Sequence, residues 1–279
     1  MCEKITSLSD YLKWAKACHE VEYGPNNELS CYQDHVYFRG HASIAWELIP
    51  SLFRDKEGRN YSEYKMLQQA NNLLWAELAD CKTELEKMIR LQHYGLKTRL
   101  LDVTYNPLIA LYFACQESIE KEKDGIVFCG YKYESSMKEP MAIADYVFNH
   151  DAITIDESEL DIVCARYKVN KHSLENIHLF NPPFNNQRVL AQNGAFIISP
   201  LLKTNEEPPF NSAKRKEVKN KMETAFAKNI VVAEHSKKCI LEELDSLGFN
   251  RYTIFRDIAN TLKYINEKEE KYGTKIPDF

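Results

Sequence analysis

Residues 91–102 combine side chains that can bind or transfer charge with a glycine turn that can hold them close to a ligand. The stretch reads Leu-Gln-His-Tyr-Gly-Leu-Lys-Thr-Arg-Leu-Leu-Asp and lies between two apolar segments. Polar groups in such a setting need partners, because burying a charge without one is costly. A second polar island, Tyr37-Phe38-Arg39-Gly40, lies upstream. We expect the two stretches to form one pocket.

Three arginines among the candidate residues, Arg39, Arg99 and Arg188, favour an anionic ligand. A guanidinium group binds phosphate or carboxylate through two parallel hydrogen bonds. The chain contains no Walker loop and no GxGxxG, HExxH or GxSxG motif, which excludes the common nucleotide-binding and hydrolase patterns. We therefore expect a phosphorylated ligand that is held without a P-loop and without a metal.

The predicted elements place these residues at the ends of strands and helices. Residues 36–40 are typical of a strand that ends at Gly40, where the backbone can approach a ligand closely. Residues 61–90 have a strongly helical composition. Asn106 and Pro107 are a typical cap and first residue of an apolar helix, which we expect to continue through residue 119 and to be central.

The rest of the chain alternates helical and strand-like patterns. The predicted elements are a helix at 7–22, a strand at 125–131, a strand with an acidic segment within 151–166, a loop at 181–184, a helical turn and strand at 187–198, a basic helix at about 212–228, a strand at 229–233, a helix from Ser236 to Gly248 and a final helix containing Ile254, Ile258, Leu262 and Ile265. This mixture predicts a single α+β domain. We expect a helical N-terminal segment at 1–30, the domain itself at 31–265 and a C-terminal tail at 266–279.

Composition and charge narrow the classes of function. The net charge of −5 provides no broad positive field for nucleic acid. One basic stretch stands out, and it is either a solvated helix face or a local phosphate contact: Lys214, Arg215, Lys216, Lys219 and Lys221. The scattered cysteines contain no CxxC pair and indicate buried thiols. No apolar run is long enough to cross a membrane and the N-terminus does not resemble a signal peptide, so we expect a cytoplasmic protein.

At these residues the chain resembles the FRG domain family, named for its Phe-Arg-Gly motif. The resemblance rests on four blocks in the expected order: Tyr37-Phe38-Arg39-Gly40 with Trp46, Leu48, Pro50, Ser51 and Arg54; residues 92–114 with their Gln-His-Tyr-Gly-Leu and Thr-Arg-Leu-Leu-Asp segments; Arg188, Ala191, Gln192, Gly194, Ala195 and Phe196; and Leu244, Gly248, Thr253, Ile254 and Phe255. The chain departs from the family pattern at Lys97, where proline is common, and at Val103, where tryptophan is common.

The resemblance implies a layout similar to ADP-ribosyltransferases related to the DNA-modifying DarT toxins. In that layout an arginine on the first strand and a serine or threonine on the second grip NAD, and a Glu or Gln near a later strand contacts the ribose. Carried over, these roles fall on Arg39, Thr98 and Gln192. The resemblance further implies that the NAD-binding surface includes Gly40, His93, Tyr94, Arg99, Asp102 and Arg188.

Gln192 is the weakest point of this scheme, because an amide cannot remove a proton as a glutamate would. Either the acceptor needs little base assistance, or Asp102 or His93 is the base, or the domain only binds. Scaffold roles also remain open: Arg99 and Asp102 can form a structural ion pair, His93 can be a core or turn residue, and Tyr94 with the following glycine can serve packing and the turn.

The leading hypothesis is an NAD-dependent ADP-ribosyltransferase that acts as a toxin or anti-phage effector on RNA or DNA, with a protein acceptor second. The nucleic-acid preference follows from the DarT-like resemblance, with slight support from the basic stretch. The alternatives are a non-catalytic sensor that binds a nucleotide or a partner protein, and an NAD glycohydrolase. A toxin role would imply an antitoxin partner.

Overall fold

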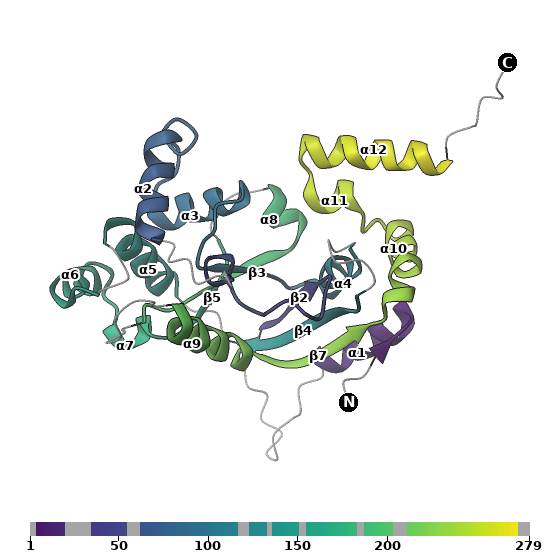
Figure 1. Ribbon diagram of the computed structural model, residues 1–279, viewed down its shortest axis with the longest axis horizontal. Helices are drawn as coiled ribbons and strands as arrows, with labels where there is room; N and C mark the ends of the chain where they lie inside the picture. The colour runs from purple at the N-terminus through teal and green to yellow at the C-terminus, as the bar shows by residue number, and fades with distance from the viewer. Residues whose placement is uncertain are drawn as a thin grey trace, which may run out of the picture.

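The computed structural model shows one mixed β-sheet with helices on both faces, which confirms the expected α+β class (Figure 1). The structure describes residues 4–19, 35–54, 62–116, 123–132, 136–150, 155–182, 187–202 and 211–272. The predicted loop at 181–184 and the end of the helix predicted to reach residue 119 fall partly outside these ranges. No helix in them is long and apolar enough to span a membrane.

The sheet of the described chain has the order β1-β7-β4-β2-β3-β6-β5. Its neighbours are antiparallel except for the parallel pair β1–β7. The N-terminal segment is therefore not purely helical, because its first residues add an edge strand to the common sheet. The strands are β1 (Lys4–Ile5), β2 (His35–His41), β3 (Leu100–Thr104), β4 (Gly125–Lys132), β5 (His178–Phe180), β6 (Gly194–Ile198) and β7 (Phe226–Val232).

The helices surround this sheet (Figure 1). In the described ranges they are α1 (Leu8–His19), α2 (Glu63–Leu73), α3 (Glu84–His93), α4 (Pro107–Cys115), α5 (Lys138–Asn149), α6 (Glu157–Tyr167), α7 (Lys171–Leu174), α8 (Gln187–Ala191), α9 (Asn211–Thr224), α10 (Lys237–Ser246), α11 (Arg251–Phe255) and α12 (Ile258–Tyr272), with the 3-10 turns η1 (Ser51–Phe53) and η2 (Glu234–Ser236).

Side-chain caps explain where several of the helices start. The Asn106 side chain accepts a hydrogen bond from Leu108 N, which confirms the predicted start of α4 at Pro107. The described part of the stretch predicted to mix a strand with an acidic segment holds helix α6 instead, which Asp156 caps. A carboxylate at this position binds the first free amides of a helix, and this capping makes the acidic segment helical.

Two predicted helices are each divided in the structure. The stretch 61–90 becomes α2 and α3, each with its own cap, Ser62 and Thr83. The final helix becomes α11 and α12, separated where Arg256 adopts a left-handed conformation at φ 50°. The composition of these stretches predicted that most of their residues are helical, but it did not predict where one helix ends and the next begins. α12 runs on to Tyr272, so the expected tail begins with ordered helix.

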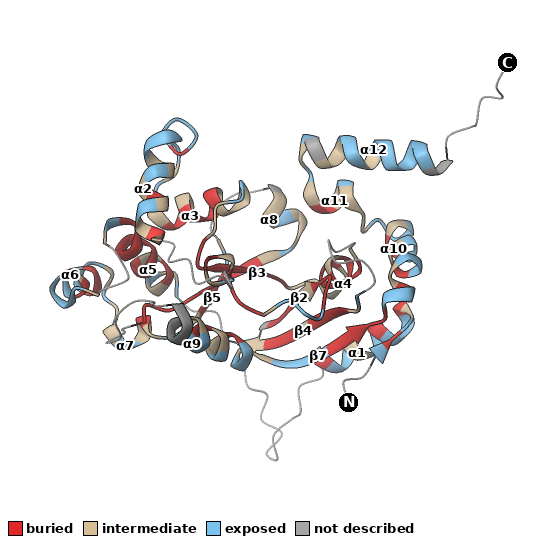
Figure 2. Cartoon of the chain, in the orientation of Figure 1, coloured by how far each residue is buried: buried red, intermediate tan, exposed pale blue. Residues whose placement is uncertain are grey.

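The two faces of the sheet carry separate cores. On one face, α3 and α5 pack on β3, β5 and β6, and α1, α4 and α10 pack on β2, β4 and β7. On the other face, α9 packs against the strand residues that alternate with those of the first core. Along β3, Leu100 faces α3, while Leu101 and Val103 face α9. Most of the central strands and α4 are buried, whereas the first half of β7 and most of α12 are exposed (Figure 2).

The sheet is weakly joined at its centre. β2 pairs with β4 from His35 to His41, but its register with β3 contains the single pair Phe38–Thr104. Beyond that pair the two strands separate. Residues 39–41 of β2 and residues 100–103 of β3 have no strand partner in each other and border an opening between the strands. Candidate residues occur on both sides of this opening.

The thiols agree with the expectation from the sequence. Among the described cysteines, Cys18, Cys115, Cys129 and Cys164 are buried and reduced. Cys239 is exposed and Cys81 is half-buried.

Candidate functional site

A pocket of about 310 Å³ lies where α3, β3 and the α8–β6 turn meet. We call it the strand-end pocket. Its polar lining comes from Gln92, His93, Asp102, Arg188 and Gln192, and Phe196 supplies an apolar wall. Four of these polar residues were predicted from the sequence, and the fold brings them together from three separate segments.

Gln192 is the most informative residue of this pocket. Its backbone N–H donates to Arg188 O at 2.9 Å, and its carbonyl accepts from Thr104 Oγ1 at 2.6 Å. Its side-chain Nε2 is buried and has no hydrogen-bond partner in the described chain. Buried donors are nearly always paired in native proteins. The backbone of Gln192 is thus held in place, and its unpaired amide is a candidate donor to a ligand oxygen.

A chain of hydrogen bonds orients the carboxylate of Asp102. The Thr98 hydroxyl donates to Gln92 Oε1, and Gln92 Nε2 donates to Asp102 Oδ2 at 2.9 Å. Thr98 itself is fully buried, and its Oγ1 also accepts from Leu100 N at 3.2 Å. The structure thus places Thr98 beneath the pocket, where it positions Gln92 and Asp102, and not in the pocket lining.

His93 and Arg188 form the outer side of the pocket. Burial, followed by the charge of Arg188, lowers the pKa of His93, and the carboxylates of Asp257 and Asp102 partly oppose this. The imidazole is therefore neutral at pH 7 and able to accept a proton. The Arg188 guanidinium lies over the ring of Phe255, 5.0 Å from its centroid, which fixes the cation beside the pocket.

Arg39 lies on the other face of the sheet, contrary to the expected single pocket. Its neighbour His41 packs on Phe128, 5.3 Å between ring centroids, on the side that α9 covers. Side chains alternate between the two faces along β2. Arg39 is two residues after Tyr37, so it points to the same face as Tyr37, which packs in the core under α9. Arg39 still reaches the opening, since its Nη1 donates to the backbone carbonyl of Asp102. The two predicted islands meet through the gap between β2 and β3.

Arg99 is a structural residue in this fold. It is buried, and its Nη2 lies 2.5 Å from Glu63 Oε2, while its Nη1 donates to Pro200 O at 2.9 Å. The hypothesised ion pair between Arg99 and Asp102 is wrong. Arg99 pairs with Glu63 on α2 instead, and the Asp102 carboxylate binds Gln92 on α3. A charge this well satisfied has little capacity left for a ligand.

Gly40, Tyr94 and Gly95 have local explanations. A Cβ on Gly40 would lie 1.9 Å from Ala110 O, so the glycine allows β2 to pack on α4. The sequence predicted a close approach of a ligand to Gly40, but the group that approaches it is the backbone of this helix. Gly95 has φ 99° and forms the turn after α3. Tyr94 caps α3 and is 74% exposed beside the pocket rim, which excludes a core packing role.

The basic stretch lies on α9, and its described side chains have acidic neighbours. Arg215 bonds Glu47 and also donates to Phe53 O at 3.0 Å. Lys219 lies 3.7 Å from both Glu47 and Glu223, and Lys221 lies 4.0 Å from Glu217. The side chain of Lys214 is outside the described set, and Lys216 is exposed. Arg215 thus anchors the loop after β2, and the helix lies on the face of the sheet opposite the strand-end pocket.

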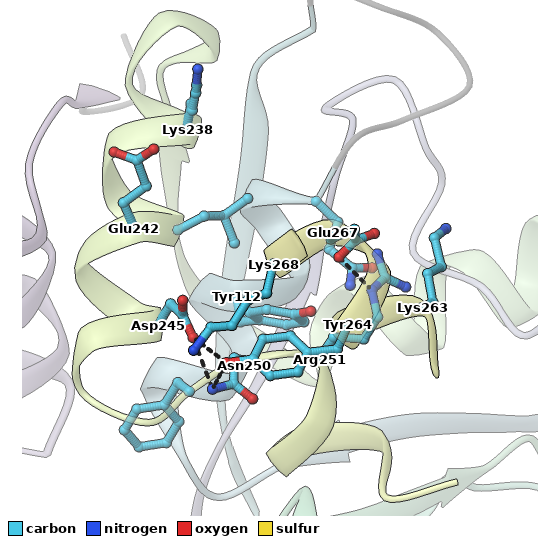
Figure 3. A pocket seen from close by; sticks show the side chains of 13 residues that line it. Tyr112, Lys238, Glu242, Asp245, Asn250, Arg251, Lys263, Tyr264, Glu267 and Lys268 are labelled. Carbon is cyan, nitrogen blue, oxygen red and sulfur yellow. Dashed lines mark hydrogen bonds and ion pairs between the residues drawn. The ribbon is translucent and has the colours of Figure 1, made fainter. Parts of the chain in front are cut away.

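A larger pocket of about 640 Å³ lies between α4, α10, α11 and α12 (Figure 3). We call it the helical pocket. Five of its polar side chains bind one another: Asn250 Nδ2 donates to Asp245 Oδ1 at 2.8 Å, Tyr264 donates to the same oxygen at 3.2 Å, and Arg251 pairs with Glu267 at 3.4 Å. Figure 3 shows these side chains turned toward one another across the groove. Such mutual pairing explains the residues without a ligand.

Three residues of the site were missed or undervalued from the sequence. Gln92 precedes His93 in the motif, and only the α3–β3 contact shows that it orients Asp102. Thr104 ends β3 and holds the Gln192 carbonyl. No sequence signal connects Asp257 with His93. Within the described residues, no group of three or more His, Cys, Asp or Glu side chains gathers as a metal site would require.

Residues 34–123 match the family model of the FRG domain. The match covers β2 to α4 and includes Arg39, Thr98 and Asp102, whereas Gln192 lies beyond it. No curated protein and no solved structure matches the chain.

Proposed function

We propose that the protein uses NAD to transfer ADP-ribose to a macromolecular acceptor. The observation that carries the proposal is the unpaired Nε2 of Gln192 in a pocket at the ends of adjacent strands. Arg39 lies on β2, Thr98 lies just before β3 and Gln192 lies in the turn before β6; β2, β3 and β6 are consecutive neighbours in the sheet. This adjacency supports the roles that the DarT-like resemblance implies.

In the proposed reaction the bond between the nicotinamide nitrogen and ribose C1′ breaks. The electron pair leaves with nicotinamide, which becomes neutral, and the acceptor nucleophile forms the new bond to C1′. The transition state resembles an oxocarbenium ion, so positioning of the ribose matters more than strong base catalysis. Gln192 Nε2 would donate to a ribose hydroxyl oxygen. Arg188 would bind the anionic part of NAD in the strand-end pocket, and Arg39 would reach it from the other face of the sheet through the opening between β2 and β3.

The acceptor must lose a proton as it attacks, and two groups in the pocket can take it. Asp102 is the better candidate, because Gln92 holds its carboxylate at 2.9 Å and its side chain is exposed toward the pocket. His93 is the second, since its lowered pKa keeps it neutral at pH 7. Replacing each one separately identifies the base: the protonated base is inactive at low pH, so Asp102→Asn or His93→Gln should flatten the acidic limb of the pH profile.

The toxin or defence role and the nucleic-acid acceptor are proposals that rest on the family resemblance. The α9 cations support nucleic-acid binding less than expected, because their described partners are acidic side chains on the face away from the pocket. RNA, DNA and protein acceptors should therefore be compared directly.

The test uses NAD labelled in its adenylate phosphate, mixed in turn with cellular RNA, DNA and protein. Labelled polymer and free nicotinamide are measured together. Gln192→Ala should reduce both about 100-fold, the usual loss for one donor that acts in the transition state. Gln116→Ala removes an amide that lines the helical pocket and should leave both unchanged.

Each other outcome selects a different function. Nicotinamide release without labelled polymer would identify an NAD glycohydrolase. NAD binding without nicotinamide release would identify a non-catalytic binding domain. If calorimetry detects no NAD binding, the proposal is wrong.

A further inference from the structure

A second arginine lies at the opening between β2 and β3, next to Arg39. Arg54 follows η1, and this turn is fastened to the residues that precede β3. Leu52 N donates to Thr98 O at 3.1 Å, and Thr98 N donates to Ser51 Oγ at 3.2 Å. Arg54 Nε donates to Ile49 O at 2.9 Å, which fixes the base of its guanidinium group.

Neither arginine has an acidic partner in the described part of the chain, where no carboxylate oxygen lies within 4 Å of either guanidinium. Arg39 donates to His41 Nε2 at 3.0 Å and to the Asp102 carbonyl, both neutral acceptors. Arg99 and Arg215, by contrast, each bind a glutamate. Arg54 is exposed and stays hydrated, so the cost of the missing carboxylate falls mainly on the half-buried Arg39, while Arg54 is accessible to a ligand.

The electrostatics of the cluster agree with this arrangement. Burial, and then the charge of Arg54, lowers the pKa of Arg39 to about 10, and Asp102 only partly opposes the shift. Burial also lowers the pKa of Arg54. The two guanidinium groups therefore repel each other in a partly desolvated place, and a bound anion would relieve that repulsion.

His41 keeps the cluster positive. Its Nε2 accepts a hydrogen bond from Arg39, so the ring must be neutral with its proton on Nδ1. Burial and both arginines lower the pKa of His41 to about 2. A neutral histidine thus orients Arg39 without neutralising it.

We propose that Arg39 and Arg54 form a two-arginine site for a diphosphate, with one guanidinium for each phosphate group. Two planar forks match two phosphates better than a single carboxylate. Naming the ligand as the diphosphate of NAD rests on the proposed function, whereas the anion site itself does not. Arg215 is a positioning residue of this site, because its bonds to Glu47 and Phe53 hold the loop that carries Arg54.

The experiment measures binding of inorganic pyrophosphate by titration calorimetry and its effect on the thermal unfolding temperature. The wild-type protein should bind and be stabilised. Arg54→Gln should weaken binding at least about tenfold, as expected for the loss of one charge-assisted fork. Arg54→Lys keeps the charge but lacks the fork and should fall between the two. Arg166→Gln removes an arginine of α6 that pairs with Asp145 of α5, and this variant should bind pyrophosphate as the wild type does.

Two further readouts separate this proposal from the proposed function. Pyrophosphate binding that depends on Arg54, without any NAD turnover, would support the anion site and contradict the transferase. NAD turnover that Arg54→Lys leaves unchanged, or absence of pyrophosphate binding to the wild type, would overturn the anion site alone. If Arg54→Gln does not fold, pyrophosphate binding is compared between Arg54→Lys and the wild type. Weaker binding by Arg54→Lys supports the anion site, and equal binding overturns it.

Discussion

The two pockets of this protein differ in how their polar groups are satisfied. The helical pocket is about twice as large, yet the polar side chains at its centre, such as Asn250 with Asp245 and Arg251 with Glu267, bind one another. The strand-end pocket is smaller and contains a buried amide nitrogen without a partner. Volume alone would select the helical pocket. The hydrogen bonding of the polar groups favours the strand-end pocket as the ligand site, because an unpaired buried donor is costly unless a ligand binds it.

The surroundings of the two pockets differ in the same way. Just before β3, the strand that carries Asp102, the pair Arg99–Glu63 is only 5–6% exposed. Beside the helical pocket, the pair Arg251–Glu267 is 24–46% exposed. Equal substitutions should therefore have unequal effects in the two regions, and four predictions test this difference.

The largest effect is expected for Glu63→Ala. It leaves the Arg99 charge buried without its carboxylate, which should lower the free energy of unfolding by about 3–5 kcal/mol. Urea unfolding followed by circular dichroism measures this. A loss below about 1 kcal/mol would show that the buried pair is no more important than an exposed one.

The second prediction concerns pH and His41. The folded pKa of about 2 lies below the ordinary value of 6.5, so the unfolded chain binds a proton first as the pH falls. The stability contributed by neutral His41 is present above pH 6.5 and is lost below it, by up to about 1.4 kcal/mol per pH unit. Urea unfolding at pH 7.5, 6.5 and 5.5 should show this slope, and His41→Gln should reduce it. Equal slopes would contradict the buried, neutral histidine.

The third prediction tests how Gln192 is held. Thr104→Val removes the hydroxyl that donates to the Gln192 carbonyl and accepts from Asn106 N. We expect NAD turnover to fall about tenfold through kcat, with KM nearly unchanged, because the amide is displaced but not lost. Thr253→Val removes a capping hydroxyl near the helical pocket and serves as the matched control. Equal loss of activity in both variants would show a general effect on stability.

The smallest effect is expected at the helical pocket. Glu267→Gln breaks a half-exposed ion pair with Arg251, and it should change the free energy of unfolding by less than about 1 kcal/mol. Activity should not change. If NAD turnover falls more than threefold in a steady-state assay, the helical pocket takes part in the reaction and the contrast between the pockets fails.

Several features of the site could be predicted from the sequence because they depend on neighbouring residues. The Asn106-Pro107 start of α4 and the Gly95 turn follow from local capping and backbone rules. The importance of Arg188 and Gln192 followed from the family motif, and both line the strand-end pocket. These predictions needed no knowledge of which element packs on which.

Other features depend on contacts between distant segments and could not be read locally. Arg99 was expected at a ligand or at Asp102, but Glu63 on α2 binds it. Thr98 was expected to grip NAD, but it supports Gln92 from below. Strand parity places Arg39 on the face opposite the strand-end pocket, and parity relative to a core is known only when the sheet is assembled.

The sequence by itself determined the α+β class, the FRG motif and the residue types that can bind an anion and a ribose. These are encoded by composition, periodicity and short motifs, which act within a few residues. The tertiary structure alone decided which of those residues are free for chemistry. The number of partners a polar group finds depends on the surrounding fold, so only the assembled sheet separates the satisfied Arg99 from the unpaired Gln192 amide.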